Sequence, residues 1–347
     1  MAKLGEVCLL KAGKFVSAND ISPEYNKGLY PCFGGNGIRG YVADYTHDGE
    51  FPLIGRQGAL CGNVNLASGK FHATEHAVVV QPKIEMNVHW LYYALNAMNL
   101  GQYATGAAQP GLAVSKLETL SIEIPNISEQ NKIAQTLCKV EQLVNFRKQQ
   151  LAKLDELVKA RFVEMFGEPI GNPMGWKRVR FDSISENLDS KRVQVTESYR
   201  KDGVYPYYGA SGIVDWINDY IFDEDILLVS EDGANLLMRS TPIAFSVSGK
   251  SWVNNHAHVV RFHDFATQKF IEVYFSLIDI SEYITGTAQP KLNQAKLNTM
   301  LFCWPPLSLQ KQFAAFVERV DQQKQTVQQS LEKLELLKKA LMQEYFG

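Results

Sequence analysis

The chain has 347 residues, 46% of them hydrophobic and 21% charged, with a formal net charge of −2. This length exceeds one ordinary hydrophobic core and predicts at least two domains. The near-neutral charge gives no electrostatic attraction to nucleic acid or membrane, and no apolar run or leader pattern indicates a membrane span or signal peptide. The five cysteines are scattered without a CxxC pair, so neither a disulfide framework nor a zinc site is indicated, and a reduced, cytoplasmic setting is expected.

The sequence contains an internal repeat of domain size. The segment "YPCFGGNGIRGYVADY" from Tyr30 matches "YPYYGASGIVDWINDY" from Tyr205, 175 positions later. Further along, "TGAAQPGLAVSKL" from Thr105 matches "TGTAQPKLNQAKL" from Thr285 at an offset of 180, so about five residues are inserted between the two matches. A period this long is typical of two domain-sized units rather than of a solenoid.

Each half consists of two parts that differ in residue composition and hydrophobic pattern. Its first part has short aromatic and β-branched runs broken by Gly, Pro, Asn and Asp, which predicts strands and loops. Its second part is rich in Leu, Lys, Glu and Gln with apolar residues at heptad spacing, which predicts a long helix, and Gly167 sits where a glycine ends such a helix. The expected divisions are globular domains at 1–125 and 168–305, and central helices at 126–167 and 306–347.

The two helices have complementary faces. Each has one apolar heptad column and one column containing Arg or Lys, and the two columns are swapped between the halves, which favours a pair of unlike helices over a homodimer. If a pseudo-twofold relates the halves, the helices run antiparallel. The predicted fold is therefore α+β: two pseudo-twofold-related α/β domains joined by two long antiparallel helices in a coiled coil, a dumb-bell. The alternative is that each helix packs on its own globular domain. The expected pairing residues are Leu137, Val144, Leu151, Leu154, Val158, Val320, Val327, Leu331, Leu334 and Leu341.

No catalytic constellation is evident. The sequence lacks a dinucleotide-binding glycine motif and a phosphate-binding P-loop. The segment from Asn172 shares only its first two residues with the Asn-Pro-Pro-aromatic motif of amino-methyltransferases. His256 and His258 share one face of a strand without a third ligand in view, so structural histidines are expected there. We expect no metal, no cofactor and no catalytic residue.

Several segments resemble one known family. They are "GNPMGWKRVRFDSI" from Gly171, the repeated TG-AQP loops, and the IP and WPP strand ends before the helices. Together with the repeat, they are similar to the specificity subunit of type I restriction–modification enzymes. One departure is that the first half, which begins MAKLGEV, has no counterpart of the segment around Trp176, so its opening strand is expected to be short or differently made.

The resemblance implies a subunit that is not itself an enzyme. Each globular domain would be a target-recognition domain reading one half of a bipartite sequence in double-stranded DNA. The paired helices would set the spacing and dock two copies of an adenine DNA methyltransferase, and a restriction/translocase subunit would join for cleavage. The methyltransferases would supply most of the phosphate neutralisation, so the free subunit is expected to bind DNA poorly. The rival hypothesis is a scaffold of the same shape that binds protein or glycan.

Two domains that read different half-sites cannot distinguish them with identical residues. The repeated loop is therefore expected to be scaffold, with base reading by its glutamine and contact with phosphate or methyltransferase as alternatives. Its marker residues are Gly106, Gln109, Pro110, Gly286, Gln289 and Pro290. Candidate base-reading residues are polar side chains where the halves diverge: Asn36, Arg39, Arg56, Gln57, Asn63, Asn65, Lys70 and His72 in the first domain, and Lys191, Arg192, Ser211, Glu231, Asp232, Asn235, Arg239, Lys250, Trp252 and Asn254 in the second.

Overall fold

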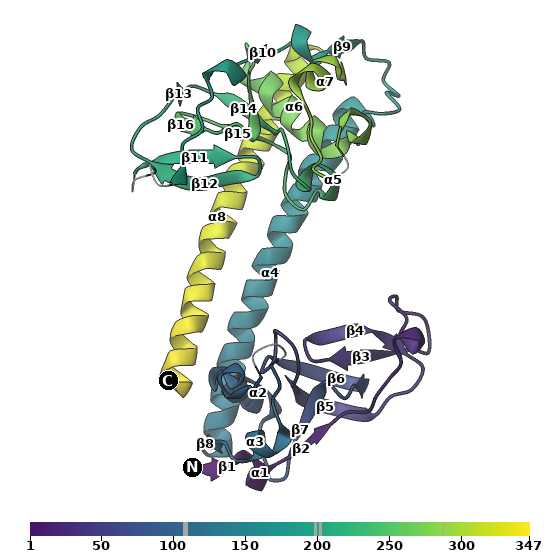
Figure 1. The fold of residues 1–347 in the computed structure, drawn as a ribbon, viewed down its shortest axis with the longest axis vertical. Coiled ribbons are helices and arrows are strands. Elements are labelled where there is room, and N and C mark those ends of the chain that lie inside the picture. Colours follow the sequence, from purple (N-terminus) through teal and green to yellow (C-terminus); the bar gives the residue numbers. More distant parts are fainter. Residues whose placement is uncertain (107–109, 198–199, 201–202, 287) are drawn as a thin grey trace. The chain divides into compact units, whose positions relative to one another are not determined.

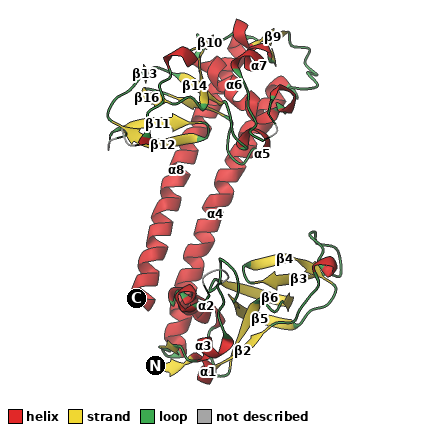
Figure 2. Ribbon diagram, in the orientation of Figure 1, coloured by secondary structure: helices red, strands yellow, loops and turns green. Residues whose placement is uncertain are grey.

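The computed structural model describes the chain except for residues 107–109, 198–199, 201–202 and 287. It is a mixed α+β protein with two sheet-rich parts and two long helices, as expected (Figures 1 and 2). The chain forms two compact units: Met1–Arg147 with Ser330–Gly347, and Lys148–Gln329. Among the described residues, no helix is both long enough and apolar enough to cross a bilayer.

The first unit is built on a six-stranded sheet with the order β2-β7-β5-β6-β3-β4. All its neighbouring strands are antiparallel except β3 and β6, which are parallel. A two-stranded ribbon pairs β1 with β8, and β1 has only two residues. The strands are β1 (Ala2–Lys3), β2 (Cys8–Ala12), β3 (Tyr30–Gly34), β4 (Gly37–Val42), β5 (His47–Gly55), β6 (Val64–Ala73), β7 (Ala77–Pro82) and β8 (Ser121–Ile122), and the short helices are α1 (Leu4–Val7), α2 (Val88–Ala97) and α3 (Val114–Glu118).

The second unit divides its strands between two four-stranded sheets, β10-β17-β14-β15 and β12-β11-β16-β13, and a ribbon of β18 with β9. The strands are β9 (Arg178–Arg180), β10 (Glu186–Asn187), β11 (Tyr205–Gly209), β12 (Gly212–Ile217), β13 (Phe222–Asp223), β14 (Ile226–Ser230), β15 (Ala244–Val247), β16 (Lys250–Val253), β17 (Ala257–Arg261) and β18 (Leu301–Cys303). The short helices are α5 (Asn235–Met238), α6 (Phe265–Leu277) and α7 (Gln294–Thr299).

The sequence repeat is also a structural repeat. The hairpin β3–β4 has its register shift between Cys32 and Phe33, and the hairpin β11–β12 has its shift at the corresponding Tyr207 and Tyr208. The first strand of each hairpin also pairs in parallel with a later strand, β3 with β6 and β11 with β16. The residues of β6 and β16 that form these pairs correspond in the repeat at the offset of 180. The five inserted residues fall in the segment that contains α5, a helix with no counterpart in the described part of the first unit.

The long helices are α4 (Ile127–Phe166) and α8 (Leu307–Phe346), each of 40 residues. Helix α4 ends at Gly167, whose φ of +77° lies in the left-handed region that glycine adopts without strain. Its amide donates to the carbonyl of Val163, and the indole of Trp176 donates to the carbonyl of Phe166. Both contacts satisfy carbonyls that the helix itself leaves without a partner.

Within each unit the two long helices contact one another in antiparallel order. In the first unit Glu141 pairs with Lys338 and Arg147 with Ser330; in the second, Asp155 pairs with Lys324. The expected pairing residues are all buried or half-buried, so the swapped apolar columns meet and the Lys and Arg stems reach to the flanks.

Each unit closes its own core around these helices. In the first, α2 packs its Trp90 against the sheet, and Tyr345 and Phe346 from the end of α8 join the same cluster. In the second, Phe162 contacts the rings of Phe166, Phe270, Tyr274 and Phe313, which joins α4, α6 and α8. The globular domains are therefore built directly on the long helices.

Candidate nucleic-acid interface

A hollow of about 490 Å³ lies at one end of the first domain's sheet. The turn of the β3–β4 hairpin contributes Asn36 and Arg39, and the loop after β5 contributes Gln57. Asn63 borders it by donating to the side-chain oxygen of Asn36 at 2.9 Å. Four candidate readers from three separate segments of the sequence therefore gather around one opening, and Asn65 lies beside the same turn, next to Gly37.

Two buried nitrogens beside this hollow have no partner. In the described part of the chain, the Nε of Arg56 and the Nδ1 of His76, a residue that lines the hollow, are buried without a hydrogen bond. A buried polar atom without a partner is costly, so such atoms are uncommon in a finished core. Both atoms are enclosed by the protein, so neither is open to a ligand in the hollow.

The corresponding place in the second domain has different chemistry. Asp232 stands where the first domain has Gln57, and its carboxylate lies 2.9 Å from Nδ1 of His256, the counterpart of His76. Ser211, the counterpart of Asn36, is exposed on the hairpin turn. The same frame therefore presents amides and a guanidinium beside the shared histidine in one domain, and a carboxylate and a hydroxyl beside it in the other.

Some candidates in the second domain belong to an internal ion network instead. Arg192 donates to Glu231 at 2.6 Å and lies 3.4 Å from Asp189. Lys291 lies 3.1 Å from the other oxygen of Glu231, and His258 lies 2.6 Å from Asp189. The Arg192 and Glu231 side chains are only 13% and 12% exposed, so both hold the domain together rather than face solvent.

The network supplies the partners of His258 that sequence reasoning missed. Asp189 and Glu231 both lie near this histidine, and the three groups are close enough together to hold a cation. However, Nδ1 of His258 already faces Asp189 and its Nε2 faces the carbonyl of Leu292 at 2.7 Å, while Arg192 and Lys291 occupy the carboxylates. The arrangement is a closed set of ion pairs, which is a structural role.

Burial and pairing act in opposite directions on the two acids. Burial tends to raise the pKa of Asp189, but hydrogen bonding to and attraction by His258 hold that pKa below its usual value. Burial likewise opposes ionisation of Glu231, and its contacts with Arg192, His258 and Lys291 bring its pKa below the usual range. Both acids are therefore kept in the charged form that the network requires.

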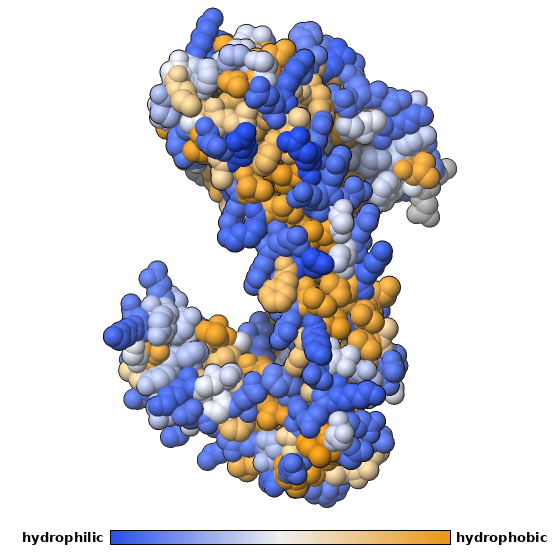
Figure 3. Space-filling view, turned by 180° about the vertical axis from the view of Figure 1, so that it is seen from behind, coloured by the Kyte–Doolittle hydropathy of each residue, from blue (hydrophilic) through white to orange (hydrophobic). Residues whose placement is uncertain are grey.

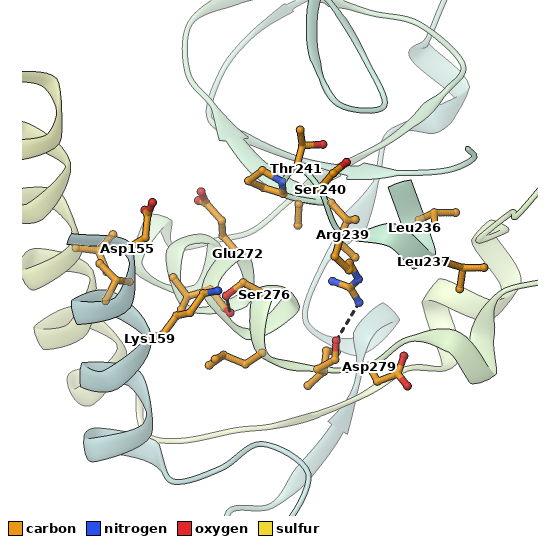
Figure 4. A pocket seen from close by; sticks show the side chains of 18 of the residues that line it. Asp155, Lys159, Leu236, Leu237, Arg239, Ser240, Thr241, Glu272, Ser276 and Asp279 are labelled. Carbon is orange, nitrogen blue, oxygen red and sulfur yellow. Dashed lines mark hydrogen bonds between the residues drawn. The ribbon is translucent and has the colours of Figure 1, made fainter. Parts of the chain in front are cut away.

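Arg239 also serves the fold. Its backbone has a left-handed φ of +52°, and its guanidinium donates to the carbonyls of Phe275 and Ile278 at the end of α6. Figure 4 draws the bond to Ile278 as a dashed line. It lines a cavity of about 650 Å³ in the second unit, between α5, the end of α6 and the long helices. A cation at a helix C-terminus satisfies carbonyls left open there, so the side chain is already engaged.

Four further candidates have internal contacts. His72 is buried between the carbonyls of Asp44 and Lys14, and Asn235 bonds to residues 240 and 241 to close its own loop. The Trp252 indole donates to the carbonyl of Val193, and buried Asn254 accepts from the amide of His256. These residues support the loops around the interface.

One expectation about divergence was wrong. Lys70 and Lys250 were placed among the positions where the halves differ, but both are lysines at corresponding places, on β6 and β16. The five-residue insertion conceals this equivalence when a single offset is used. Lys191 is exposed next to Arg192 and remains a candidate reader.

The repeated loops attach in the same way in both domains. In the first, Gly58 donates to the carbonyl of Pro110 at 3.0 Å and Leu112 to that of Arg56 at 2.9 Å. In the second, Gly233 donates to Pro290 at 3.0 Å and Leu292 to Glu231 at 2.8 Å. Gly106 and Gly286 both have positive φ, and Gln289 is exposed, while Gln109 lies outside the described residues. Each loop therefore holds the segment that carries candidate readers.

Comparison with known proteins gives a match over most of the chain. The family model of the type I restriction modification DNA specificity domain matches residues 1–156 and again residues 173–336. The two matches correspond to the two halves of the repeat.

Individual relatives agree with this match. The specificity subunit of the type I restriction enzyme EcoprrI of Escherichia coli is 53% identical over 143 residues, which are 41% of this chain and 36% of that protein, so the match spans little more than a third of the relative. The MjaIX specificity subunit of Methanocaldococcus jannaschii is 22% identical over 75% of this chain and 68% of its own. The type I restriction-modification S subunit from M. genitalium has the same fold, with a TM-score of 0.67 at 17% identity over 99% of this chain and 95% of its own.

Proposed function

Because the chain belongs to the family of type I restriction modification DNA specificity domains, we propose that it selects the DNA target of a type I restriction–modification enzyme. Each globular domain reads one half of a bipartite site in double-stranded DNA. The observation that carries this proposal is the pair of corresponding surfaces with unlike polar groups, Asn36, Arg39 and Gln57 in one domain and Ser211 and Asp232 in the other. Two such surfaces suit two different half-sites.

The groups on these surfaces have the chemistry of base reading. In the major groove a guanidinium suits guanine O6 and N7, an amide suits adenine N6 and N7, and a carboxylate accepts from cytosine N4. We retain as readers Asn36, Arg39, Arg56, Gln57, Asn63, Asn65, Lys191, Ser211 and Asp232, and assign to the fold His72, Arg192, Glu231, Asn235, Arg239, Trp252 and Asn254.

The repeated TG-AQP loops act as scaffold in this proposal. Their matched hydrogen bonds to the segments at Arg56 and Glu231 support that role, because a shared frame can position unlike readers. The exposed amide of Gln289 stays available for a phosphate or a protein partner.

The long helices set the spacing and dock two copies of an adenine DNA methyltransferase. Phe146 on α4 is 61% exposed and Leu336 on α8 is 69% exposed. Figure 3 shows hydrophobic residues exposed among hydrophilic ones on the face that it draws. Exposed apolar side chains that lie together are typical of protein interfaces, whereas single ones are ordinary. The chain itself catalyses no reaction and acts in the cytoplasm, and a restriction/translocase subunit completes the assembly for cleavage.

The test is to sequence the methylated motif in cells that carry the chain with its cognate methyltransferase. Gln57→Ala is expected to relax one half-site only, and Asp232→Ala the other, each costing about 1–3 kcal/mol of discrimination at one base pair. Glu85→Ala, an exposed change in the first domain outside the hollow, serves as control. A motif that all three variants leave intact would favour the second candidate, a scaffold that binds protein or glycan.

A further inference from the structure

The two domains share one exposed side-chain cluster that neither the core nor the base-reading surface requires. Each consists of a tyrosine that begins the first hairpin strand, a second tyrosine just after that hairpin, and a lysine on the strand that pairs in parallel with the first hairpin strand. We call these the tyrosine–lysine clusters. They comprise Tyr30, Tyr45 and Lys70 in the first domain and Tyr205, Tyr220 and Lys250 in the second.

The geometry of the rings is nearly the same in both clusters. The Tyr30 and Tyr45 centroids are 5.0 Å apart at 61°, and those of Tyr205 and Tyr220 are 5.2 Å apart at 62°. Each is an edge-to-face pair, the arrangement that aromatic rings favour.

The ammonium groups also correspond. Nζ of Lys70 lies 4.7 Å from the centre of the Tyr45 ring, and Nζ of Lys250 lies 4.6 Å from that of Tyr220. A cation over an aromatic face at this distance is held by the ring's electrons. The clusters therefore fix a positive charge in the same place in each domain.

The backbone places the clusters equivalently. Lys70 on β6 stands opposite Asp48 in the antiparallel ladder, and Lys250 on β16 stands opposite Asp223. The two aspartates also correspond in the repeat. Among the described residues no salt bridge joins Lys70 to Asp48 or Lys250 to Asp223, and both lysines are exposed, so each ammonium can be reached by an outside anion.

Burial does not explain the clusters. Tyr45 is 43% exposed and Tyr220 37% exposed, and both lysines are exposed. A structural lid over the end of a sheet would need only the apolar rings. The lysine adds a charge whose long side chain loses rotamer freedom when it is held over a ring, so its presence in both domains points to a ligand.

The surroundings of the clusters have diverged, but the clusters have not. Nearby candidate readers differ between the domains, as in Arg39 against Val214 and Gln57 against Asp232. A group that is the same in two domains reading different half-sites cannot distinguish the half-sites. The feature common to both half-sites is the sugar–phosphate backbone, which is recognised by cations and hydroxyl donors without regard to sequence.

We infer that each tyrosine–lysine cluster binds a backbone phosphate of the DNA, with the lysine ammonium as the charged donor and the tyrosine hydroxyls as neighbouring donors. This inference rests on the proposed function and adds to it a pair of matched contacts that orient each domain on its half-site. Phosphate contacts fix register and orientation, whereas base contacts select sequence.

The experiment measures binding of the assembled complex with methyltransferase to the target duplex and to a random duplex over a range of salt concentrations. The variants are Lys70→Gln, Lys250→Gln and their combination. Each phosphate contact contributes about 0.9 to the slope of log K against log salt concentration, so each single change should lower that slope by about one and the combination by about two. Affinity for both duplexes should fall by the same factor, and the methylated motif should stay unchanged.

Lys177→Gln is the matched control, since it removes one exposed positive charge outside both clusters and outside the long helices and should leave the slope as it is. Thermal unfolding of each variant checks that the fold is kept. An unchanged slope in the double variant would overturn the inference, as would a change at one base position or loss of methyltransferase binding. If the unaltered complex did not prefer its target over the random duplex, the proposed function would fail first.

Discussion

Nζ of Lys324 on α8 lies 2.6 Å from Oδ1 of Asp155 on α4. Lysines in the charged heptad column of α8 form salt bridges with acidic residues of α4, both in this pair and between Lys338 and Glu141. Both partners of the first pair are partly exposed, at 33% and 57% for Lys324 and Asp155, so the pair selects helix register more than it adds stability.

This pairing predicts the outcome of a charge swap. Asp155→Lys places two cations together and should lower the free energy of unfolding by about 1 kcal/mol, and adding Lys324→Asp should restore most of the loss. Urea unfolding of the two single variants and the double variant measures the coupling. Additive losses in the double variant would show that the two side chains do not interact.

Phe162 should be among the costliest positions of the second unit. It is 1% exposed and contacts four other rings, so Phe162→Ala leaves a large cavity and should cost about 3–5 kcal/mol. Thermal and urea unfolding provide the measurement. A loss below about 1 kcal/mol would mean that the core refills the space.

Phe146 offers the opposite case on the same helix. Because it is 61% exposed, Phe146→Ala should change the stability of the isolated chain by less than about 0.5 kcal/mol. If the helices dock methyltransferase there, the same change should weaken that association at least tenfold in a titration followed by calorimetry. Unchanged affinity would exclude this side chain from the interface.

The ion network predicts the acid response of the second unit. The pKa values of Asp189 and Glu231 lie below those of the unfolded chain, which are about 3.9 and 4.3. Their contribution to stability is therefore present above about pH 4 and is lost as the pH falls through the lower, folded values. Asp189→Asn should lower the free energy of unfolding by about 3 kcal/mol at pH 7 and should make its decline below pH 4 less steep. Urea unfolding at pH values between 2.5 and 7 measures both effects. Glu85→Gln, on the surface of the first unit, should leave the curve unaltered.

A longer α4 should lengthen the gap between half-sites. Four residues inserted near Gln149 add about 6 Å of helix, close to two base pairs at about 3.4 Å each. The methylated motif should keep both half-sites and gain one or two base pairs of spacer. Full methylation with an unchanged gap would show that the helices do not set the spacing.

The long helices were predictable because their signals are local and repeated. Heptad spacing runs through both, and the absence of interior Gly and Pro allowed bounds within one residue of Ile127–Phe166 and Leu307–Phe346. The repeat itself predicted two similar sheet-rich parts. The sequence did not predict that the main sheet of the first domain is single while the strands of the second domain divide between two four-stranded sheets. That difference depends on pairing between distant segments, for which no local pattern exists.

The roles of charged side chains were less predictable. Arg192 reaches Glu231 across 39 positions, and His258 reaches Asp189 across 69, so neither partner could be read from neighbouring residues. Arg239 looked like a free cation in a polar loop, whereas the fold brings the end of α6 to it. In contrast, the hairpin that carries Asn36 and the loop that carries Gln57 line one hollow, and the role of these residues as readers stays a prediction.

The route of the chain through its two units has a consequence for synthesis. Leu341, Met342, Tyr345 and Phe346 pack into the core of the first unit, and the Phe346 ring lies 6.5 Å from that of Trp90. A ribosome makes residues 148–329 before it reaches this segment, so the second unit has all its residues while the first still lacks part of its core. The domain begun first is thus completed last, and a nascent chain cut short before residue 330 would leave apolar surface of α2 and α4 open to chaperones and proteases.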